Sequence, residues 1–157
     1  MKIKIIVVGK TKEKFLQSGE EEFQQKLARY CQLEWVVVKE EKIISDKAEP
    51  IIKPKEAERI LNKTSKGSLV IALDRTGDQM SSKELAEFLQ QKMNEGYGET
   101  TFIIGGTLGL GKNVLKSAAT VLSLSKMTFT HEMSRLILLE QLYRAFTILK
   151  GKKYHKR

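Results

Sequence analysis

Five largely apolar runs, alternating with stretches of helical spacing, restrict the fold of this chain more than any other feature. The runs cover residues 3–8, 33–38, 69–73, 101–104 and 120–124. Such runs predict strands that are covered on both faces. Strands that alternate with helices predict a parallel sheet between two helical layers. We therefore expect an α/β fold in which ligands bind beyond the carboxyl ends of the strands.

The helical stretches cover residues 13–31, 55–63, 112–118 and 132–149, and a further helix should begin after Ser81 or Ser82 and end at Gly96. Ser81 and Glu84 have the spacing of a capping box. The last helix is apolar over a wide arc. We therefore expect it to contact a partner chain as well as its own sheet.

The connection between the second and third strands is polar, rich in lysine, and contains both prolines, Pro50 and Pro54. We expect this connection to be flexible up to the helix at residue 55. No shift in composition marks a second domain, and 157 residues can enclose one core without disulfides. The prediction is a single domain over residues 1–157, with a basic tail at 150–157.

The chain is strongly basic, with 28 Lys and Arg against 19 Asp and Glu, a net charge of +9 and an isoelectric point near 9.6. The last eight residues contain five basic residues and no acid: Lys150, Lys152, Lys153, Lys156 and Arg157. A basic tail is expected of a protein that meets a phosphate backbone. Solvated basic termini are also common, so charge alone leaves both interpretations open.

The single cysteine, Cys31, cannot form an internal disulfide. Together with the lack of an apolar leader, this predicts a reducing, cytoplasmic location. The first strand is interrupted by lysines, and no run approaches the length of a membrane span. We expect a soluble protein with no membrane partner.

Gly105, Gly106, Gly109 and Gly111 follow the fourth strand directly. Four glycines in seven residues are costly, because glycine loses more backbone freedom on folding than any other residue. The usual gain is close approach of the main chain to a ligand or to another backbone segment. We predict a loop that faces a ligand.

A P-loop is one alternative for this loop, because Gly106, Gly111 and Lys112 have the required spacing. However, Asn113 stands where a hydroxyl should bind magnesium, and Asp74 is the one candidate for the second metal contact. A P-loop-like nucleotide hydrolase is therefore an alternative. A dinucleotide site is not predicted, because the third glycine of its fingerprint is replaced by Val114.

Leu73, Gly105 and Leu124 mark the carboxyl ends of three predicted strands. These ends would present main-chain N–H and C=O groups with few reactive side chains nearby. That pattern predicts a cofactor held by backbone and apolar contacts, and no metal ion.

Several blocks of the chain resemble the RlmH family in the same order and spacing, essentially from end to end. These blocks are Val8-Gly9-Lys10, Ile103-Ile104-Gly105-Gly106, residues 122–129, His131, residues 140–145 and Tyr154-His155. The family is similar to SPOUT-class methyltransferases and acts on N3 of a pseudouridine in 23S ribosomal RNA, the RNA of the large ribosomal subunit.

The resemblance implies a deep trefoil knot near the C-terminus, an exception to the rule that chains avoid threading. It implies S-adenosylmethionine as methyl donor, a homodimer with its sites near the subunit interface, and the ribosome as substrate. The cofactor residues that it implies are Leu73, Gly105, Leu124, Ser125, Lys126, Met127, Thr128 and Phe129.

The reaction needs the methyl group and its acceptor placed in line with water excluded. The acceptor N3 attacks best without its proton, so a base or a positive charge should help. The resemblance suggests Arg144 and His155, with Tyr154 positioning the base or the tail. The alternative for Arg144 is a structural role alone, as an ion pair with Glu140 four residues earlier on the same helix. His155 would close over the site from a tail that is otherwise mobile.

Two positions depart from the family pattern. Leu108 replaces a small polar residue in the glycine loop, and Thr130 replaces a proline, which should loosen the entry to the last helix. His131 is interpreted as a helix-entry residue bonded to main chain, and Asp74 and Glu140 are possible auxiliary groups.

A non-catalytic RNA-binding module is a further alternative. It is disfavoured because only 7% of residues are aromatic, too few for a base-stacking platform.

Overall fold

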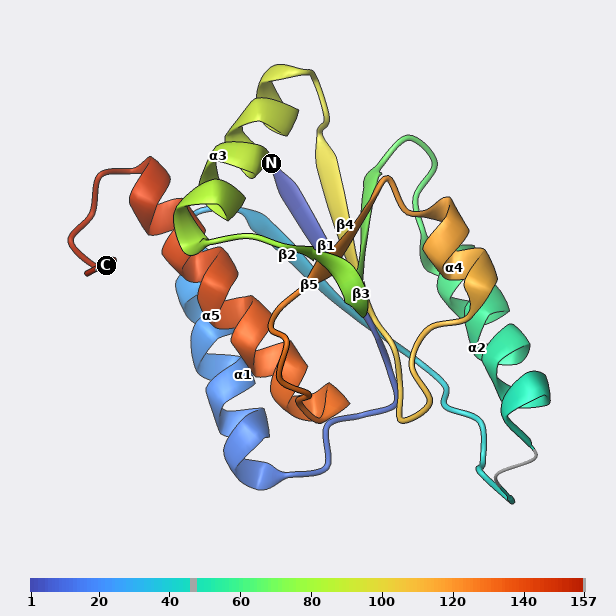
Figure 1. Cartoon of the computed structure of the whole chain (residues 1–157). Coiled ribbons are helices and arrows are strands. Elements are labelled where there is room, and N and C mark those ends of the chain that lie inside the picture. The colour runs from blue at the N-terminus through green and yellow to red at the C-terminus, as the bar shows by residue number, and fades with distance from the viewer. Residues whose placement is uncertain (46–47, 157) are drawn as a thin grey trace.

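The computed structural model describes residues 1–45 and 48–156, and these form one five-stranded sheet flanked by helices (Figure 1). In chain order the elements are β1 (Lys2–Val8), α1 (Lys14–Leu27), β2 (Gln32–Val38), α2 (Glu49–Lys63), β3 (Leu69–Gln79), α3 (Ser82–Asn94), β4 (Glu99–Ile104), α4 (Lys112–Ser117), β5 (Thr120–Ser123) and α5 (His131–Leu149).

The strands lie in the order β2-β1-β4-β3-β5, and every neighbouring pair is parallel. Helices α1, α3 and α5 cover one face, and α2 and α4 cover the other (Figure 1). The parallel, doubly covered sheet predicted from the apolar runs is confirmed. All five carboxyl ends therefore lie at one edge of the sheet.

The apolar runs are explained by a core on each face of the sheet. Ile3, Ile5 and Val7 of β1 pack toward the three-helix face, whereas Ile6 and Val8 pack toward α2 and α4. These residues are at most 1% exposed. Because successive side chains of a strand point to opposite faces, a strand buried on both sides is apolar at most positions. The buried Lys4 is the exception in β1, and its ammonium group donates to the carbonyl of Lys63 (3.0 Å) and to Ser65 Oγ (2.6 Å).

Helix α2 begins at Glu49 and contains both prolines, so the prediction of an irregular segment up to residue 55 was wrong. Pro50 stands in the first turn, where a missing N–H costs no helical hydrogen bond. Pro54 lies inside the helix and does remove one. The buried face formed by Ile52, Ala57 and Ile60 offsets this loss. The part of the flexible connection at residues 46 and 47 lies outside the described residues.

Strand β3 continues to Gln79, although we expected a loop after Leu73. Its two halves pair with the same short strand, because Leu122 of β5 is opposite both Leu73 and Asp78. A Cβ atom on Gly77 would lie 2.5 Å from the carbonyl carbon and oxygen of Val121, so only glycine fits. One segment thus passes on both sides of β5, as a threaded chain would. The trefoil knot itself remains a prediction.

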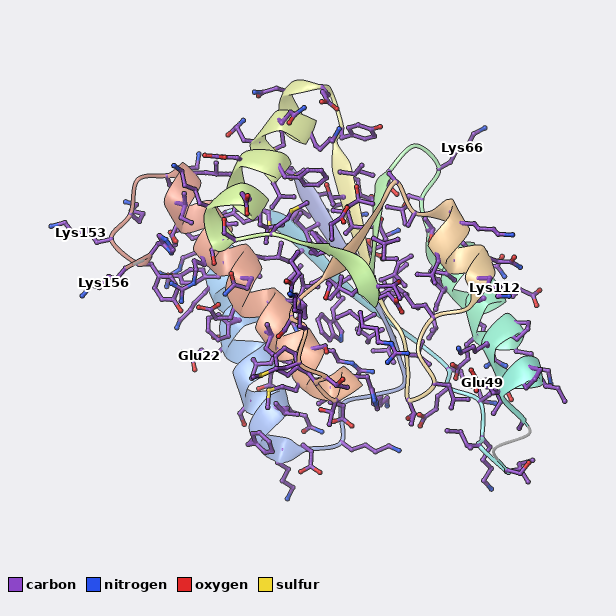
Figure 2. The ribbon with its side chains drawn as sticks, in the orientation of Figure 1. Glu22, Glu49, Lys66, Lys112, Lys153 and Lys156 are labelled. Carbon is purple, nitrogen blue, oxygen red and sulfur yellow. The ribbon has the colours of Figure 1, made fainter. Side chains whose placement is uncertain are left out.

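The C-terminal segment folds back against α5. The N–H of Lys152 donates to the carbonyl of Thr147 (2.9 Å), and the ring of Tyr154 packs edge-on against Tyr143, with ring centroids 4.6 Å apart. Lys153 and Lys156 extend away from the helices (Figure 2). Arg157, the last residue of the predicted basic tail, lies outside the described part of the chain.

We expect Gly77→Ala to lower the free energy of unfolding by about 1–3 kcal/mol or to prevent folding, because its Cβ would collide with rigid main chain. Chemical denaturation measures the effect. Gly98→Ala is the matched control, since its Cβ would meet nothing within 4 Å. It should change stability by no more than about 0.5 kcal/mol. Equal stability of the two variants would contradict the close packing of β3 on β5.

Candidate functional site

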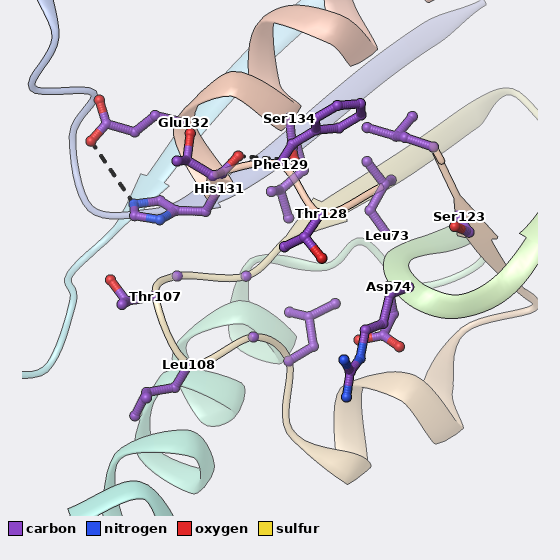
Figure 3. A pocket seen from close by; sticks show the side chains of 18 of the residues that line it. Leu73, Asp74, Thr107, Leu108, Ser123, Thr128, Phe129, His131, Glu132 and Ser134 are labelled. Carbon is purple, nitrogen blue, oxygen red and sulfur yellow. Dashed lines mark hydrogen bonds and ion pairs between the residues drawn. The ribbon is translucent and has the colours of Figure 1, made fainter. Parts of the chain in front are cut away.

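Residues 73–76 in the middle of β3, together with the carboxyl ends of β4 and β5, border a cleft of about 960 Å³ (Figure 3). Of the residues predicted to hold a cofactor, Leu73, Gly105, Leu124, Ser125, Met127, Thr128 and Phe129 line this cleft, and Lys126 does not. The structure therefore brings the three predicted strand ends together. Their role in cofactor binding remains a prediction.

The glycine loop, residues 105–111, forms one wall of the cleft and folds back on itself. The N–H of Gly109 donates to the carbonyl of Gly106 (3.0 Å), and Gly109 has a positive φ of 79°. A Cβ on Gly105 would lie 2.7 Å from the carbonyl carbon of Gly109. Two of the four glycines are thus required by backbone packing within the loop. Thr107 and Leu108, at the bend of the loop, also line the cleft (Figure 3).

The segment between β5 and α5 forms the facing wall and is held by its own hydroxyl groups. Ser123 Oγ donates to the carbonyl of Ser125 (3.0 Å), and Ser125 Oγ accepts from the N–H of Met127 (3.0 Å). Thr130 Oγ1 accepts from the N–H of Met133 (3.2 Å) and so caps α5. Threonine therefore supplies a cap that proline would lack, contrary to the looser entry that we expected.

His131 and Glu132, the first residues of α5, line the cleft beside this segment (Figure 3). Glu132 Oε1 accepts from the N–H groups of Lys12 (2.7 Å) and Glu13 (3.2 Å). Burial opposes ionisation of Glu132, but these two bonds outweigh it and lower the pKa of its carboxyl. Burial, followed by the nearby Arg135 cation, lowers the pKa of His131. The cleft therefore has a neutral imidazole and a carboxylate at this end.

Arg135 is fully buried one helical turn further along, and the sequence analysis did not single it out. Its guanidinium donates to the carbonyl of Val8 (2.7 Å) and to Thr11 Oγ1 (3.0 Å). Thr11 donates in turn to the buried carboxyl of Glu20 (2.7 Å). The signal in the sequence that could have identified Arg135 is its position directly before the apolar residues 136–139 of the same helix. The network fastens the start of α5 to the end of β1.

The predicted catalytic residues Arg144, Tyr154 and His155 form a separate cluster that does not line the cleft. Arg144 forms an ion pair with Glu140, which is the alternative that the sequence left open. The Cζ atom of Arg144 also lies 4.8 Å from the centre of the Tyr154 ring. Tyr154 donates to Glu140 Oε1 (3.1 Å). Arg144 is thirteen residues beyond His131 in α5, or about 20 Å along its axis. Within one chain, the cluster and the cleft are at opposite ends of the helix.

His155 is half-buried, and its Nδ1 atom has no hydrogen-bond partner among the described residues. The segment that carries it packs on α5 through Lys152 and Tyr154. That this tail is otherwise mobile and closes over the site stays a prediction.

The two auxiliary acids that we considered are already engaged. Asp74 accepts a hydrogen bond from the N–H of Thr76 (3.0 Å) within β3, and Glu140 belongs to the C-terminal cluster. In residues 1–45 and 48–156, no three His, Cys, Asp or Glu side chains gather as metal ligands would. No helix of that part of the chain has the length and apolar character needed to cross a bilayer. Helix α4, after the glycine loop, has only six residues.

Comparison with known proteins points to methyl transfer. A family model described as a predicted SPOUT methyltransferase matches residues 1–155. Proteins named ribosomal RNA large subunit methyltransferase H from Acetivibrio thermocellus and Clostridioides difficile are 46% and 48% identical, over 99% of this chain and their whole length. The structure of a probable methylase family protein from Haemophilus influenzae aligns with a TM-score of 0.58 at 17% identity, covering 99% of this chain and 70% of that one. This last likeness concerns the fold alone.

We expect the free energy of unfolding to fall as the pH drops below about 6.5, partly because of His131. The pKa of His131 is lower in the folded state than in the unfolded state. As the pH falls, the unfolded chain therefore binds a proton first, which stabilises the unfolded state relative to the folded one. The loss of unfolding free energy that is due to His131 should stop once the pH is below the pKa of this residue in the folded state. Urea unfolding from pH 7.5 to 5 measures it, and His131→Gln should reduce the drop. An equal drop in the wild type and in this variant would refute the shifted pKa.

Proposed function

Because the chain belongs to the SPOUT methyltransferase family, we propose that it transfers a methyl group from S-adenosylmethionine to N3 of a pseudouridine in 23S ribosomal RNA. The cleft between residues 73–76 of β3 and the carboxyl ends of β4 and β5 is the observation that carries this proposal. The full-length similarity to large-subunit RNA methyltransferases supports ribosomal RNA as the substrate class.

The cleft suits a cofactor held by backbone. Gly105 and Gly106 present main chain on one side, and residues 124–129 present main chain on the other. Leu73 and Phe129 add apolar surface. S-adenosylmethionine would supply a methyl group on a positively charged sulfur, and apolar walls would keep water away from it. Lys126 does not line the cleft, so its proposed contribution comes through the main chain of its turn.

The residues of the C-terminal cluster suit the acceptor. N3 of pseudouridine must lose a proton to attack, and the resulting negative charge needs a cation nearby. The hydrogen bond from Arg144 to Glu140 raises the pKa of the guanidinium, so Arg144 stays charged. Burial and then the Glu140 charge raise the pKa of Tyr154, so its phenol stays protonated and holds Glu140 in place. His155 is the proposed proton acceptor. Its Nδ1 atom is buried and has no hydrogen-bond partner among the described residues, so it must be uncovered before it can accept the proton.

We propose a homodimer in which the C-terminal cluster of one chain faces the cleft of the other. The distance along α5 keeps the two sites of one chain apart, and a second chain packed antiparallel would bring them together. Met133 and Ile137 are apolar residues of α5 that remain partly exposed, which supports contact with a partner. The wide apolar arc of this helix led to the same expectation.

The proposal also includes the trefoil knot, the organisation of residues 1–157 as one domain, and action on the assembled ribosome in the cytoplasm. The pairing of β5 with both halves of β3 supports the knot. The one continuous sheet supports a single domain. The ribosomal substrate and the location rest on similarity to the RlmH family.

In cells that lack this protein, we expect mass spectrometry of 23S ribosomal RNA to show the loss of one methyl group from a pseudouridine. The wild-type gene and Gly98→Ala should restore the methyl group. Gly105→Ala should not, because its Cβ would push the glycine loop apart. By calorimetry, Gly105→Ala should bind S-adenosylmethionine at least tenfold more weakly than wild type. An unchanged methylation pattern in the deleted strain would refute the proposed function.

Deletion of residues 153–157 should abolish methylation and leave S-adenosylmethionine binding nearly intact, because Tyr154 and His155 lie outside the cleft. Mixing this inactive chain with the inactive Gly105→Ala chain should restore about a quarter of wild-type activity. With random pairing, half of the dimers are mixed, and each has one complete site. Activity of the deleted chain alone, or no recovery on mixing, would contradict the shared site.

A further inference from the structure

A second, smaller hollow of about 510 Å³ lies next to the cleft, between the end of β2 and the glycine loop. Its lining residues are Lys12, Lys39, Glu40, Glu41, Lys42, Ile43 and Thr107. Thr107 lines both the hollow and the cleft. The two cavities are therefore neighbours, separated by the tip of the glycine loop.

The carboxylates in this hollow are already paired, and two of its lysines are not. Lys12 Nζ lies 3.5 Å from Glu40 Oε1, and Glu41 forms an ion pair with Arg59. No carboxylate of the described residues is within ion-pair distance of Lys39 or Lys42, and both lysines are exposed. The positive charge that remains for a ligand is therefore concentrated on these two side chains.

The main chain under these lysines is anchored to α2. The N–H of Glu41 donates to the buried carboxyl of Glu56 (2.9 Å), and Arg59 donates to the carbonyl of Lys39 (3.0 Å). Glu56 is only 6% exposed, and burial raises the pKa of its carboxyl. A ligand that binds Lys39 and Lys42 would thus meet a segment that is already held in place, which lowers the entropy cost of binding.

The hollow also offers one apolar and one hydroxyl contact. Ile43 is 46% exposed and adds apolar surface to the hollow. Thr107 is exposed at the boundary with the cleft. Two unpaired cations, a hydroxyl and an exposed aliphatic side chain match the phosphate, ribose and base of a polynucleotide.

We infer that this hollow binds the phosphate backbone of the RNA strand next to the nucleotide that enters the cleft. Lys39 and Lys42 hold phosphates, and Thr107 donates to the phosphate nearest the cleft. Phosphate contacts of this kind position a strand without reading its sequence. The inference rests on the proposed function, because it takes the substrate of the neighbouring cleft to be RNA.

The test compares the double variant Lys39→Gln/Lys42→Gln with Lys66→Gln/Lys116→Gln, which carries the same change of charge. Lys66 precedes β3 and projects into solvent (Figure 2), and Lys116 precedes β5, so both are at the amino ends of strands. Binding of large ribosomal subunits from the deleted strain is measured without methyl donor at several salt concentrations. We expect the hollow variant to bind at least tenfold more weakly than wild type. The slope of log affinity against log salt should fall by about 1.5, as for the loss of two phosphate contacts.

The control variant should bind like wild type, and both variants should keep wild-type affinity for S-adenosylmethionine. Equal RNA binding by the two double variants would overturn the inference. The inference would also be overturned if light scattering gave the Lys39→Gln/Lys42→Gln variant a smaller molecular mass than wild type and the variant had no other defect. The hollow would then contact a second copy of the chain. If the wild-type protein itself neither binds nor methylates the subunits, the proposed function fails. If it does both and the hollow variant is unimpaired, only this inference fails.

Discussion

The packing of β5 against both halves of β3 is the contact on which the rest of the structure depends. A strand of only four residues makes few ladder hydrogen bonds and would be a weak edge strand by itself. The return of β3 beside Leu122, made possible by the missing side chain of Gly77, holds β5 on a second side. This places residues 73–76 of β3 and the tips of β4 and β5 around one cleft and directs the chain to α5 on the three-helix face.

The start of α5 is fastened to the sheet by a buried charge. An isolated buried guanidinium would be costly, but Arg135 donates to Val8 and Thr11 and lies near the carboxyl of Glu20. Burial raises the pKa of the Glu20 carboxyl and lowers the pKa of the Arg135 guanidinium, and the nearby carboxylates offset only part of the effect on Arg135. An apolar side chain at this position could fill space but could not satisfy the carbonyl of Val8. The polar network therefore holds one wall of the cleft in a single position relative to β1.

Helix α5 separates two chemical environments. At its start are a neutral imidazole, a capping threonine and the cleft. Near its end, Arg144, Tyr154 and Glu140 form a compact set of charge-assisted contacts. Under the proposed function these are two half-sites, one for a cofactor and the other for an anionic acceptor. An assembly of two chains offers a physical reason for keeping them at opposite ends of one rigid helix.

The sequence by itself determined the elements and the sheet. Continuous apolar runs require strands buried on both faces, the spacing of Ser81 and Glu84 marked a capped helix, and the strand ends at Leu73, Gly105 and Leu124 marked the edge where a cleft forms. Only the tertiary structure decided that β3 continues past Leu73, that both prolines lie within α2, and that Arg144, Tyr154 and His155 lie outside the cleft. These features depend on contacts between residues distant in sequence, such as Gly77 against Val121 and Arg135 against Val8. Local periodicity reports which side chains are buried, but not which distant backbone they are buried against.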